Sequence, residues 1–203
     1  MSQLKLTADG GGGTVSLKGP SSTTGNAAIE LTVPGTGSST LATTATAGKV
    51  LQTIMVEKTD TTSHSAGSTI QDISGMTVNI TPSATSSKIL VTSTVQICAY
   101  TGGYSFALYL MRDSTNLSIG DASSNRTRAT FGGLTNANND YDLRPFTISY
   151  LDSPNTTSQV TYKWRWNNPY HSTAMYLNRP QGFADGSYSV MTSSNIIVQE
   201  IGA

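Results

Sequence analysis

Short segments in which apolar and polar residues alternate follow one another from about Leu51 to the C-terminal end of the chain. About ten of them are spaced at roughly even intervals, at residues 51–58, 75–82, 88–100, 104–112, 117–120, 127–131, 144–152, 159–166, 174–179 and 195–201. Turn-forming sequences such as YTGGY, DSPNTT and FADGS lie between them. A two-residue period indicates β-strands with one buried face, and this spacing is typical of a β-sandwich or barrel. The pattern therefore predicts an all-β, antiparallel fold.

The segment 195–201 differs from the others because both of its faces carry apolar residues. One face holds Ile196, Val198 and Glu200, and the other holds Ile197, Gln199 and Ile201. We therefore expect a central strand that is covered on both sides. No stretch keeps a 3.6-residue apolar period, and ATTATAGKVLQ at 42–52, which comes nearest, is expected to form a turn at most.

Residues 1–50 have a different pattern, that of an extended arm. Three short alternating segments, 3–7, 14–18 and 28–34, are separated by stretches rich in glycine, serine and threonine. Their apolar residues are Leu4, Leu6, Val15, Leu17, Ile29, Leu31 and Val33. Strands this short and this far apart cannot bury a core alone, so we expect them to fold only against copies of themselves or against another protein. The sequence thus predicts an attachment arm at 1–50 and a head domain at 51–203.

Four consecutive glycines, Gly10, Gly11, Gly12 and Gly13, interrupt the arm. A phosphate-binding P-loop requires lysine and then serine or threonine directly after the last glycine, whereas Lys18 here lies between Leu17 and Gly19. A dinucleotide fingerprint requires a following helix, and TVSL reads as a strand. The remaining interpretations are a flexible hinge or, as we prefer, an arm whose glycines pass close to another protein's backbone.

Composition narrows the classes of partner. Charged residues make up 12% of the chain, with 12 basic and 12 acidic side chains and a net charge of +0. Such a chain has no basic excess with which to follow a phosphate backbone, so we expect no nucleic-acid partner. No apolar run is long enough to cross a membrane and the N-terminus lacks the apolar core of a signal peptide, so we expect no membrane partner. The single cysteine, Cys98, forms no internal disulfide.

Catalytic side chains are few, and we predict that the protein is not an enzyme. Both histidines, His64 and His171, lie in polar turn sequences, and a triad of a serine, His171 and Asp185 would lack any nucleophile motif. Cys98 ends a β-run and is interpreted as a small buried residue. The acidic pairs Asp140/Asp142 and Asp113/Asp121 lack calcium-loop spacing, so we predict that they are solvated loop residues. We accordingly predict no cofactor and no metal. The alternative is an ion bound on a trimer axis.

Aromatic residues gather in one predicted hairpin. They are Tyr162, Trp164, Trp166, Tyr170 and Tyr176. Alternation places the first three on one face of a strand, where they would pack in the core or at a trimer interface. The alternative is a platform on which sugar rings stack beside Asn167, Asn168 and Asn178. Arg126 and Arg128 are interpreted as a charged strand edge, with Asp121 or an acid of another subunit as a further candidate partner.

Several segments, in their order along the chain, resemble a family of virion proteins from tailed phages, many of them cyanobacterial. They are LKLTADGGGGTVSLKGPSSTTGNAAIELTVPG at 4–35, ISGMTVNITPSATSSKILVTSTVQI at 73–97, LMRDST at 110–115, GDASSNRTRATFGG at 120–133 and IIVQEIGA at 196–203. The resemblance implies a head that is a jelly roll of the C1q and tumour-necrosis-factor type, with about eight to ten strands, assembled as a homotrimer. It further implies a non-enzymatic part of the virion surface, assembled in the host cytoplasm.

Within that family, two roles are open. In the first, the protein is a capsid decoration or cement protein, whose arm binds the major capsid protein or another virion structural protein. In the second, it is a short tail fibre, spike or receptor-binding protein that recognises host-surface glycan. The chain lacks the long shaft, the collagen-like repeat and the heptads of a long fibre, which favours the capsid role.

Overall fold

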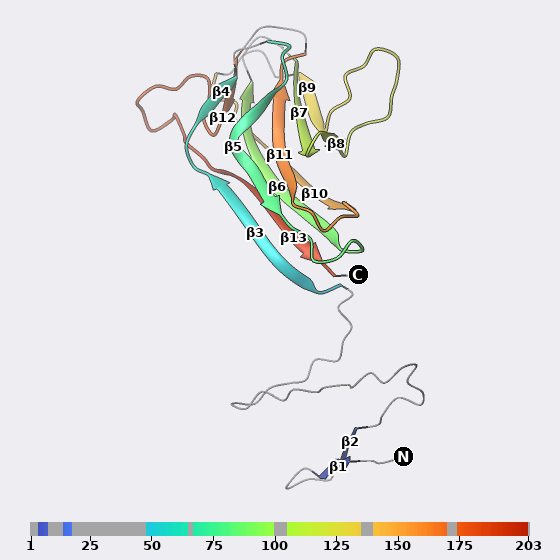
Figure 1. Ribbon diagram of the computed structural model, residues 1–203. Helices are drawn as coiled ribbons and strands as arrows, with labels where there is room; N and C mark the ends of the chain where they lie inside the picture. The colour runs from blue at the N-terminus through green and yellow to red at the C-terminus, as the bar shows by residue number, and fades with distance from the viewer. Residues whose placement is uncertain are drawn as a thin grey trace. The chain divides into compact units, whose positions relative to one another are not determined.

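The computed structural model describes residues 48–64, 67–99, 105–134, 140–169 and 174–202, together with two short strands nearer the N-terminus, β1 (Leu4–Thr7) and β2 (Thr14–Leu17). The chain divides into two units, Met1–Thr43 and Thr44–Ala203, and each is considered by itself. The described part of the second unit consists of strands and turns without a helix (Figure 1), which confirms the all-β prediction.

Two antiparallel sheets make up the second unit. The first contains β3 (Val50–Lys58), β13 (Ser194–Ile201), β6 (Lys88–Ala99) and β10 (Arg144–Asp152), with β12 (Met175–Leu177) and β4 (Thr62–His64) continuing it at one end. The second contains β5 (Gln71–Ile80), β11 (Val160–Asn167), β7 (Ser105–Arg112), β8 (Thr115–Leu117) and β9 (Phe131–Leu134). The strand order is β3–β13–β6–β10 in one sheet and β5–β11–β7 with β8 and β9 in the other.

The connections define a jelly roll. From β3 the chain crosses to β5, returns to β6, and crosses again to β7, β8 and β9. It then repeats the exchange through β10, β11 and β13, so that the last strand lies between β3 and β6. Two antiparallel sheets linked by such crossings form a double-sheet jelly roll, and the predicted jelly-roll sandwich is confirmed.

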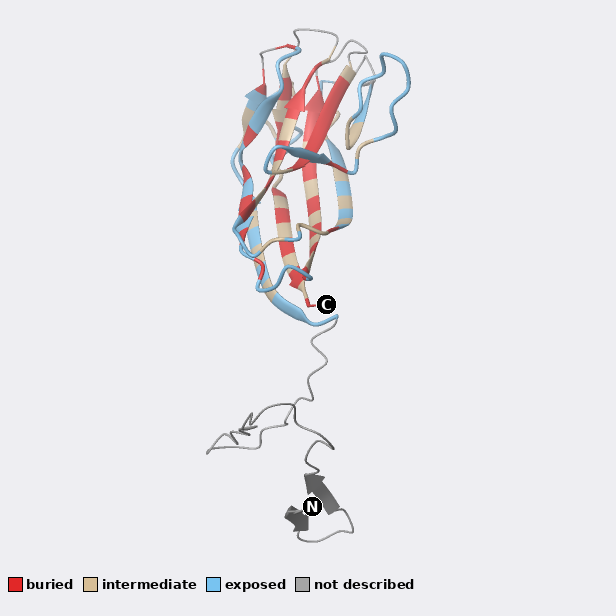
Figure 2. Cartoon of the chain, turned by 45° about the vertical axis from the view of Figure 1, so that its right-hand side comes forward, coloured by how far each residue is buried: buried red, intermediate tan, exposed pale blue. Residues whose placement is uncertain are grey.

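The core fills the space between the two sheets. Figure 2 shows buried residues, in red, alternating with less buried ones along several strands. Alternate residues of β6 are buried, among them Ile89, Val91 and Val95. They face Trp164 of β11, whose indole Nε1 donates a 2.8 Å hydrogen bond to Ser93 Oγ. Burial of a polar indole group is tolerated because it finds this partner across the sandwich.

Most predicted strands match the structure closely, and β13 confirms the expectation of a central strand. It pairs with β3 on one side and β6 on the other. The expected cover on both sides is wrong, because Ile196 and Val198 lie in the core while Ile197 and Ile201, on the other face, are half-buried outside it. Two predicted strands are wrong. The 117–120 strand ends at Leu117 in β8, and the 127–131 strand is mostly loop, since β9 begins only at Phe131.

A single threonine explains why the edge of the second sheet is broken there. Thr130 Oγ1 accepts a 2.9 Å hydrogen bond from Leu110 N and donates one of 2.9 Å to Leu117 O. Its own backbone N–H donates to Leu108 O. Thr130 therefore closes the gap between β8 and β9 along β7, and the intervening residues leave the sheet as a loop.

In the first unit, β1 pairs with β2 in antiparallel register, with Leu4 opposite Leu17 and Leu6 opposite Val15. The strand after the glycine run is thus confirmed. The expectation that these strands pair only with other chains is wrong, because two short strands joined closely in sequence can pair as a hairpin. The other predicted arm residues, Gly10, Gly11, Gly12, Gly13, Ile29, Leu31 and Val33, lie outside the described residues.

Candidate interaction surfaces

The first sheet has one face in the core and one that faces away from it, here called the outer face. Register places its side chains in rows across four strands. One row is Met55, Ile197, Thr92 and Ser149, and the next is Thr53, Gln199, Leu90 and Leu151. The outer face is thus built from aliphatic and hydroxyl side chains that come from distant parts of the sequence.

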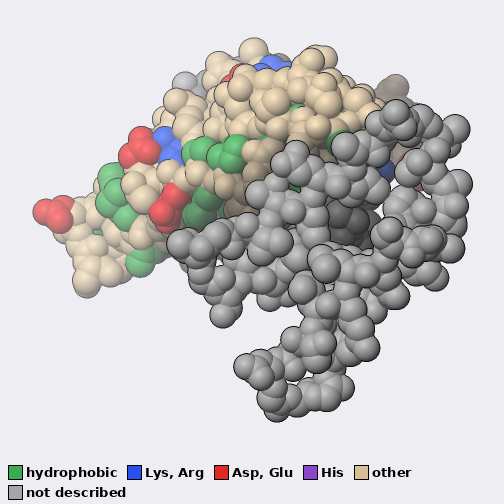
Figure 3. All heavy atoms as spheres, turned by 60° about the horizontal axis from the view of Figure 1, so that its bottom comes forward, with side chains coloured by type: hydrophobic (Ala, Val, Ile, Leu, Met, Phe, Trp, Pro, Cys, Tyr) green, Lys and Arg blue, Asp and Glu red, His purple; other side chains and the backbone are tan. Residues whose placement is uncertain are grey.

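Large apolar side chains stand exposed on the outer face. Leu51 is 42% exposed, Met55 50% and Leu151 56%. In the described strands only Glu57 and Lys88 bring a charge to this face. Figure 3 draws one side of the molecule, on which hydrophobic side chains reach the surface beside uncharged, acidic and basic ones. A surface that is both apolar and poor in charge is typical of a protein contact.

A second exposed apolar region is the loop between β12 and β13. Phe183, Tyr188 and Met191 are each about half exposed or more. Arg179 lies over the ring of Tyr176, 4.1 Å from its centroid, and 5.0 Å from that of Phe183. The sequence predicted only a turn here, because the aromatic residues show no period that would mark a surface.

The aromatic hairpin belongs to the core. Tyr162, Trp164 and Trp166 are at most 2% exposed, so they offer no face to a sugar or to another subunit. Core packing, one of the predicted interpretations, accounts for these three residues. The alternative interpretation, a platform on which sugar rings stack, is wrong for them. Tyr176 is half-buried beneath Arg179, and Tyr170 lies outside the described residues.

The predicted asparagine neighbours are also internal. Asn167, Asn168 and Asn178 are all buried. Asn178 Nδ2 donates to the backbone oxygens of Lys58 and Asp60 at 2.7 and 2.9 Å, which joins the end of β3 to β12. These amides hold strands together and are not available to a ligand.

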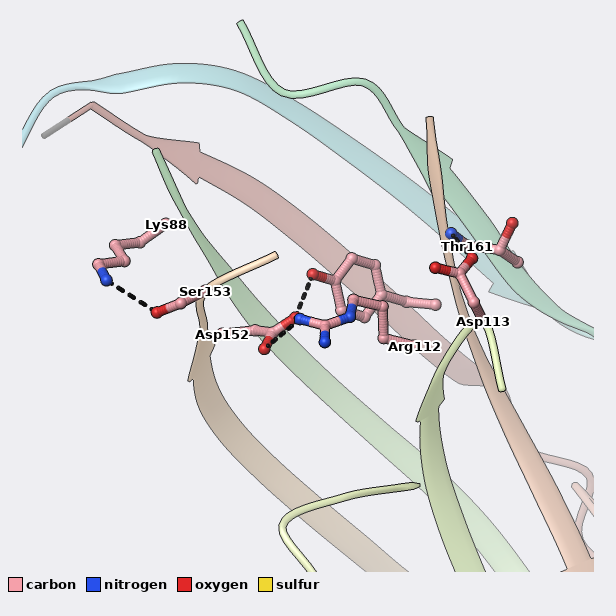
Figure 4. Close-up of polar contacts among 7 residues, drawn as sticks. Lys88, Arg112, Asp113, Asp152, Ser153 and Thr161 are labelled. Atoms are coloured by element: carbon pink, nitrogen blue, oxygen red, sulfur yellow. Dashed lines mark hydrogen bonds and ion pairs between the residues drawn. The ribbon is translucent and has the colours of Figure 1, made fainter. Parts of the chain in front are cut away.

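An ion pair links the two sheets at one end of the sandwich (Figure 4). Arg112 Nη1, at the end of β7, donates to both carboxylate oxygens of Asp152 on β10, at 2.9 and 2.8 Å. Tyr162 Oη donates to the same carboxylate at 2.7 Å. Burial and this bond to Asp152 raise the pKa of Tyr162, so the phenol stays protonated and remains a donor. The cluster is a structural cross-link.

Glu200 is a second buried carboxylate, on β13. Its oxygens accept hydrogen bonds from Ser83 N and Ser83 Oγ at 2.7 and 2.6 Å and from Gln52 Nε2 at 2.7 Å. Burial alone would raise the pKa of Glu200, but the bonds from Ser83, Ser87 and Gln52 outweigh it and lower the pKa to about 2.

We expect this carboxylate to make the head sensitive to acid. The stabilisation is fully present above the ordinary pKa of 4.5 and disappears as pH falls toward about 2, because the unfolded chain binds the proton more readily. The expected loss is about 2–3 kcal/mol of unfolding free energy between pH 5 and pH 2. Urea unfolding at several pH values measures it. In Glu200→Gln the slope over this window should be smaller, and an unchanged slope would contradict the assignment.

Two of the residues considered for catalysis, His64 and Cys98, are closed to solvent. His64 lies on β4, not in a polar turn as predicted; it is buried, 2.8 Å from Thr69 O through Nε2 and 5.7 Å from the ring of Trp166. Cys98 is buried as predicted, and desolvation raises its pKa. Neither can attack a dissolved substrate. His171 lies outside the described residues, and Asp185 is exposed.

The acidic and basic loop residues have local partners. Asp142 pairs with Arg144 at 2.6 Å, and Asp113 Oδ1 accepts from Thr161 N at 2.9 Å. The predicted strand edge at Arg126 and Arg128 is wrong, because both lie in the loop after β8. Among the described residues no group of three or more His, Cys, Asp or Glu side chains is placed to hold a metal ion. Nor does any helix in this part of the chain have the length and apolarity to span a membrane.

Comparison with known proteins gives no family. No family model matches the sequence, and no curated protein matches it. Similar solved structures include VP2 of infectious bursal disease virus as a D431N mutant in T=1 particles, with 14% identity, a TM-score of 0.36, and coverage of 98% of this chain and 44% of that one. The virus's Gx strain gives 16% identity, a TM-score of 0.34, and coverage of 98% and 50%. The chain therefore spans half or less of these proteins, and similarity at this level assigns neither a family nor a function.

Proposed function

We propose that the chain is a non-enzymatic structural protein of a virion, which assembles with copies of itself through the outer face. The observation that carries this proposal is the combination of Leu51, Met55 and Leu151, all about half exposed, on a sheet face almost free of charge. Exposing such a face to water is unfavourable, and covering it with a like surface removes apolar area from solvent. The jelly roll itself is an architecture that viral capsid proteins use.

The position of the two charges supports a second copy of the chain as the partner. Glu57 lies in the row of Asn195 and Thr94, and Lys88 lies beside Ile201 at the other end of the face. Because these two charges have opposite signs, no large field of one sign opposes contact between copies of the face. A homotrimer is the assembly that we propose.

Within the virion we propose a decoration or cement role on the capsid. The compact jelly-roll head follows residues 1–50 directly, and β1 and β2 show that this first part can adopt strands. Three such arms on one trimer would bind a shell together, because linked sites raise the effective concentration of one another. We propose that residues 1–50 bind the major capsid protein.

Deleting residues 1–35 should separate assembly from attachment. We expect the truncated protein to keep the oligomeric mass of the full chain and to lose its binding to capsids that lack the protein. Co-sedimentation with such capsids measures attachment, with the full chain as control. A truncated protein that still decorates the particles fully would contradict the role of the arm.

A second candidate is a short tail fibre or spike that recognises host-surface glycan. The observation that favours it is a groove on the second sheet, between β7, β9 and the loop after β8, which is lined by uncharged polar and apolar residues. Adsorption of labelled protein to host cells discriminates between the two roles. A capsid protein without receptor function would leave the cells unlabelled.

A further inference from the structure

The groove beside β7 and β9 has a volume of about 810 Å³, within the range of small-molecule sites. It is lined by Ser105, Phe106 and Ala107 of β7, Gly132 and Gly133 of β9, Asn125, Thr127 and Ala129 of the loop, and Pro169 after β11. It lies on the second sheet, away from the outer face of the first. A ligand in this groove would therefore not contact the outer face through which we propose that copies assemble.

The floor of the groove is made of small residues. Ala107 and Gly132 are partners in the β7–β9 register, so both belong to the same face of the sheet. A Cβ atom on Gly132 would come within 2.9 Å of Phe106 O, a contact closer than real side chains make. Glycine therefore lets β9 lie against β7 and leaves a flat floor where a ligand can approach the backbone closely.

The loop that forms one wall is held in place before any ligand arrives. Thr130 ties its end to β7 and β8 through the hydrogen bonds described above. Arg126 Nη1 donates to Ser123 Oγ at 2.8 Å, and Arg128 Nε donates to Gly120 O at 2.6 Å. Residues 125, 127 and 129 line the groove, while both arginines are engaged within the loop. A wall that is already ordered loses little entropy on binding.

The chemistry of the lining is polar and neutral. None of its nine residues carries a charge. Asn125 and Thr127 are exposed, and within the described structure their side chains form no hydrogen bond. An amide and a hydroxyl can each donate and accept, which suits a ligand that is rich in hydroxyl groups. Pro169, which is half-buried, provides apolar surface beside them for the C–H faces of such a ligand.

We infer that this groove binds a neutral oligosaccharide. Phosphates, nucleotides and acidic sugars would find no cation in the lining to replace their hydration. A purely apolar ligand would leave Asn125 and Thr127 without partners, which lowers its affinity. A hydroxyl-rich ring satisfies both requirements, since it offers hydrogen-bonding edges and C–H faces. The inference does not depend on the proposed assembly, because none of the lining residues belongs to the first sheet.

An array of oligosaccharides built from glucose, galactose, mannose, rhamnose and N-acetylglucosamine, with sialylated and uronic-acid analogues, tests the inference on the full chain. We expect binding to neutral members. In calorimetry with the best of them, Asn125→Ala together with Thr127→Ala should weaken binding at least tenfold, because two hydrogen bonds are lost. Thr127→Trp should abolish binding by filling the groove, whereas Thr127→Ser should keep affinity within threefold.

Ser86→Trp is the matched control, since Ser86 is exposed on a turn outside the groove. It should bind like the unaltered chain, and thermal unfolding should show all variants folded. Three results would overturn the inference: no neutral sugar bound at millimolar concentration, preference for acidic sugars, or binding unchanged in Thr127→Trp. Capture of an extended peptide on β9 in place of sugar would likewise overturn it. None of these results changes the oligomeric mass, so the assembly proposal is judged separately.

Discussion

Replacing Asp152 by alanine is expected to lower the unfolding free energy of the head by about 3–5 kcal/mol, the range found when one partner of a buried ion pair is removed. Asp152 is 5% exposed. Its carboxylate accepts hydrogen bonds from Arg112 and from the Tyr162 hydroxyl, both of which belong to the opposite sheet. Without the carboxylate, a guanidinium and a phenol at the end of the core have no acceptor. Chemical denaturation monitored by tryptophan fluorescence measures the change.

Asp72 provides the matched control. It pairs with Lys163 and Arg165 at 2.8 Å in each case, but its side chain is 49% exposed. Asp72→Ala should therefore lower stability by about 1 kcal/mol or less. Asp152→Asn, which keeps the shape and one acceptor, should fall between the two. Equal losses in Asp72→Ala and Asp152→Ala would show that Asp152 is not a cross-link between the sheets.

The double substitution Met55→Lys with Leu151→Lys is expected to dissociate the assembled protein into folded monomers. Both side chains are exposed on the outer face, so the head itself should tolerate the change with a loss of no more than about 0.5 kcal/mol each. In the assembly, each lysine would be buried without a partner, and like charges would meet across the contact. Juxtaposed like charges cost several kcal/mol, which corresponds to a weakening of the association by at least about 100-fold.

Ser86→Lys with Thr157→Lys is the control, because it adds the same charge at exposed positions outside the first sheet. This variant should keep the mass of the unaltered chain in light scattering after size exclusion. Dissociation of both double variants would show that net charge, and not the outer face, governs assembly. Persistence of the oligomer in Met55→Lys with Leu151→Lys would place the contact elsewhere, for example at the loop that carries Phe183 and Tyr188.

The sequence predicts long strands well because alternation over eight or more residues has few interpretations. The strand at 144–152 matches β10 at both ends, and 195–201 differs from β13 by one residue. Strands of three residues, such as β4 and β8, are too short to show a period. The break at Thr130 depends on hydrogen bonds to Leu110 and Leu117, which alternation does not encode.

The surfaces are less predictable from the sequence than the strands are, because alternation separates the two faces of a strand without telling which one is buried. Trp164 could have faced solvent by that criterion, and its place in the core follows from its position opposite Leu110 and its bond to Ser93. The outer face could not be predicted either. Met55, Ile197 and Leu151 become neighbours only through the register of β3, β13, β6 and β10.

The mass of the full chain in solution tests the central proposal, self-assembly through the outer face, most directly. Sedimentation equilibrium over micromolar to millimolar concentration should give three times the chain mass of 21.3 kDa. The Met55→Lys and Leu151→Lys variant should give the mass of one chain under the same conditions. A single-chain mass for the unaltered protein over the whole concentration range would contradict the account.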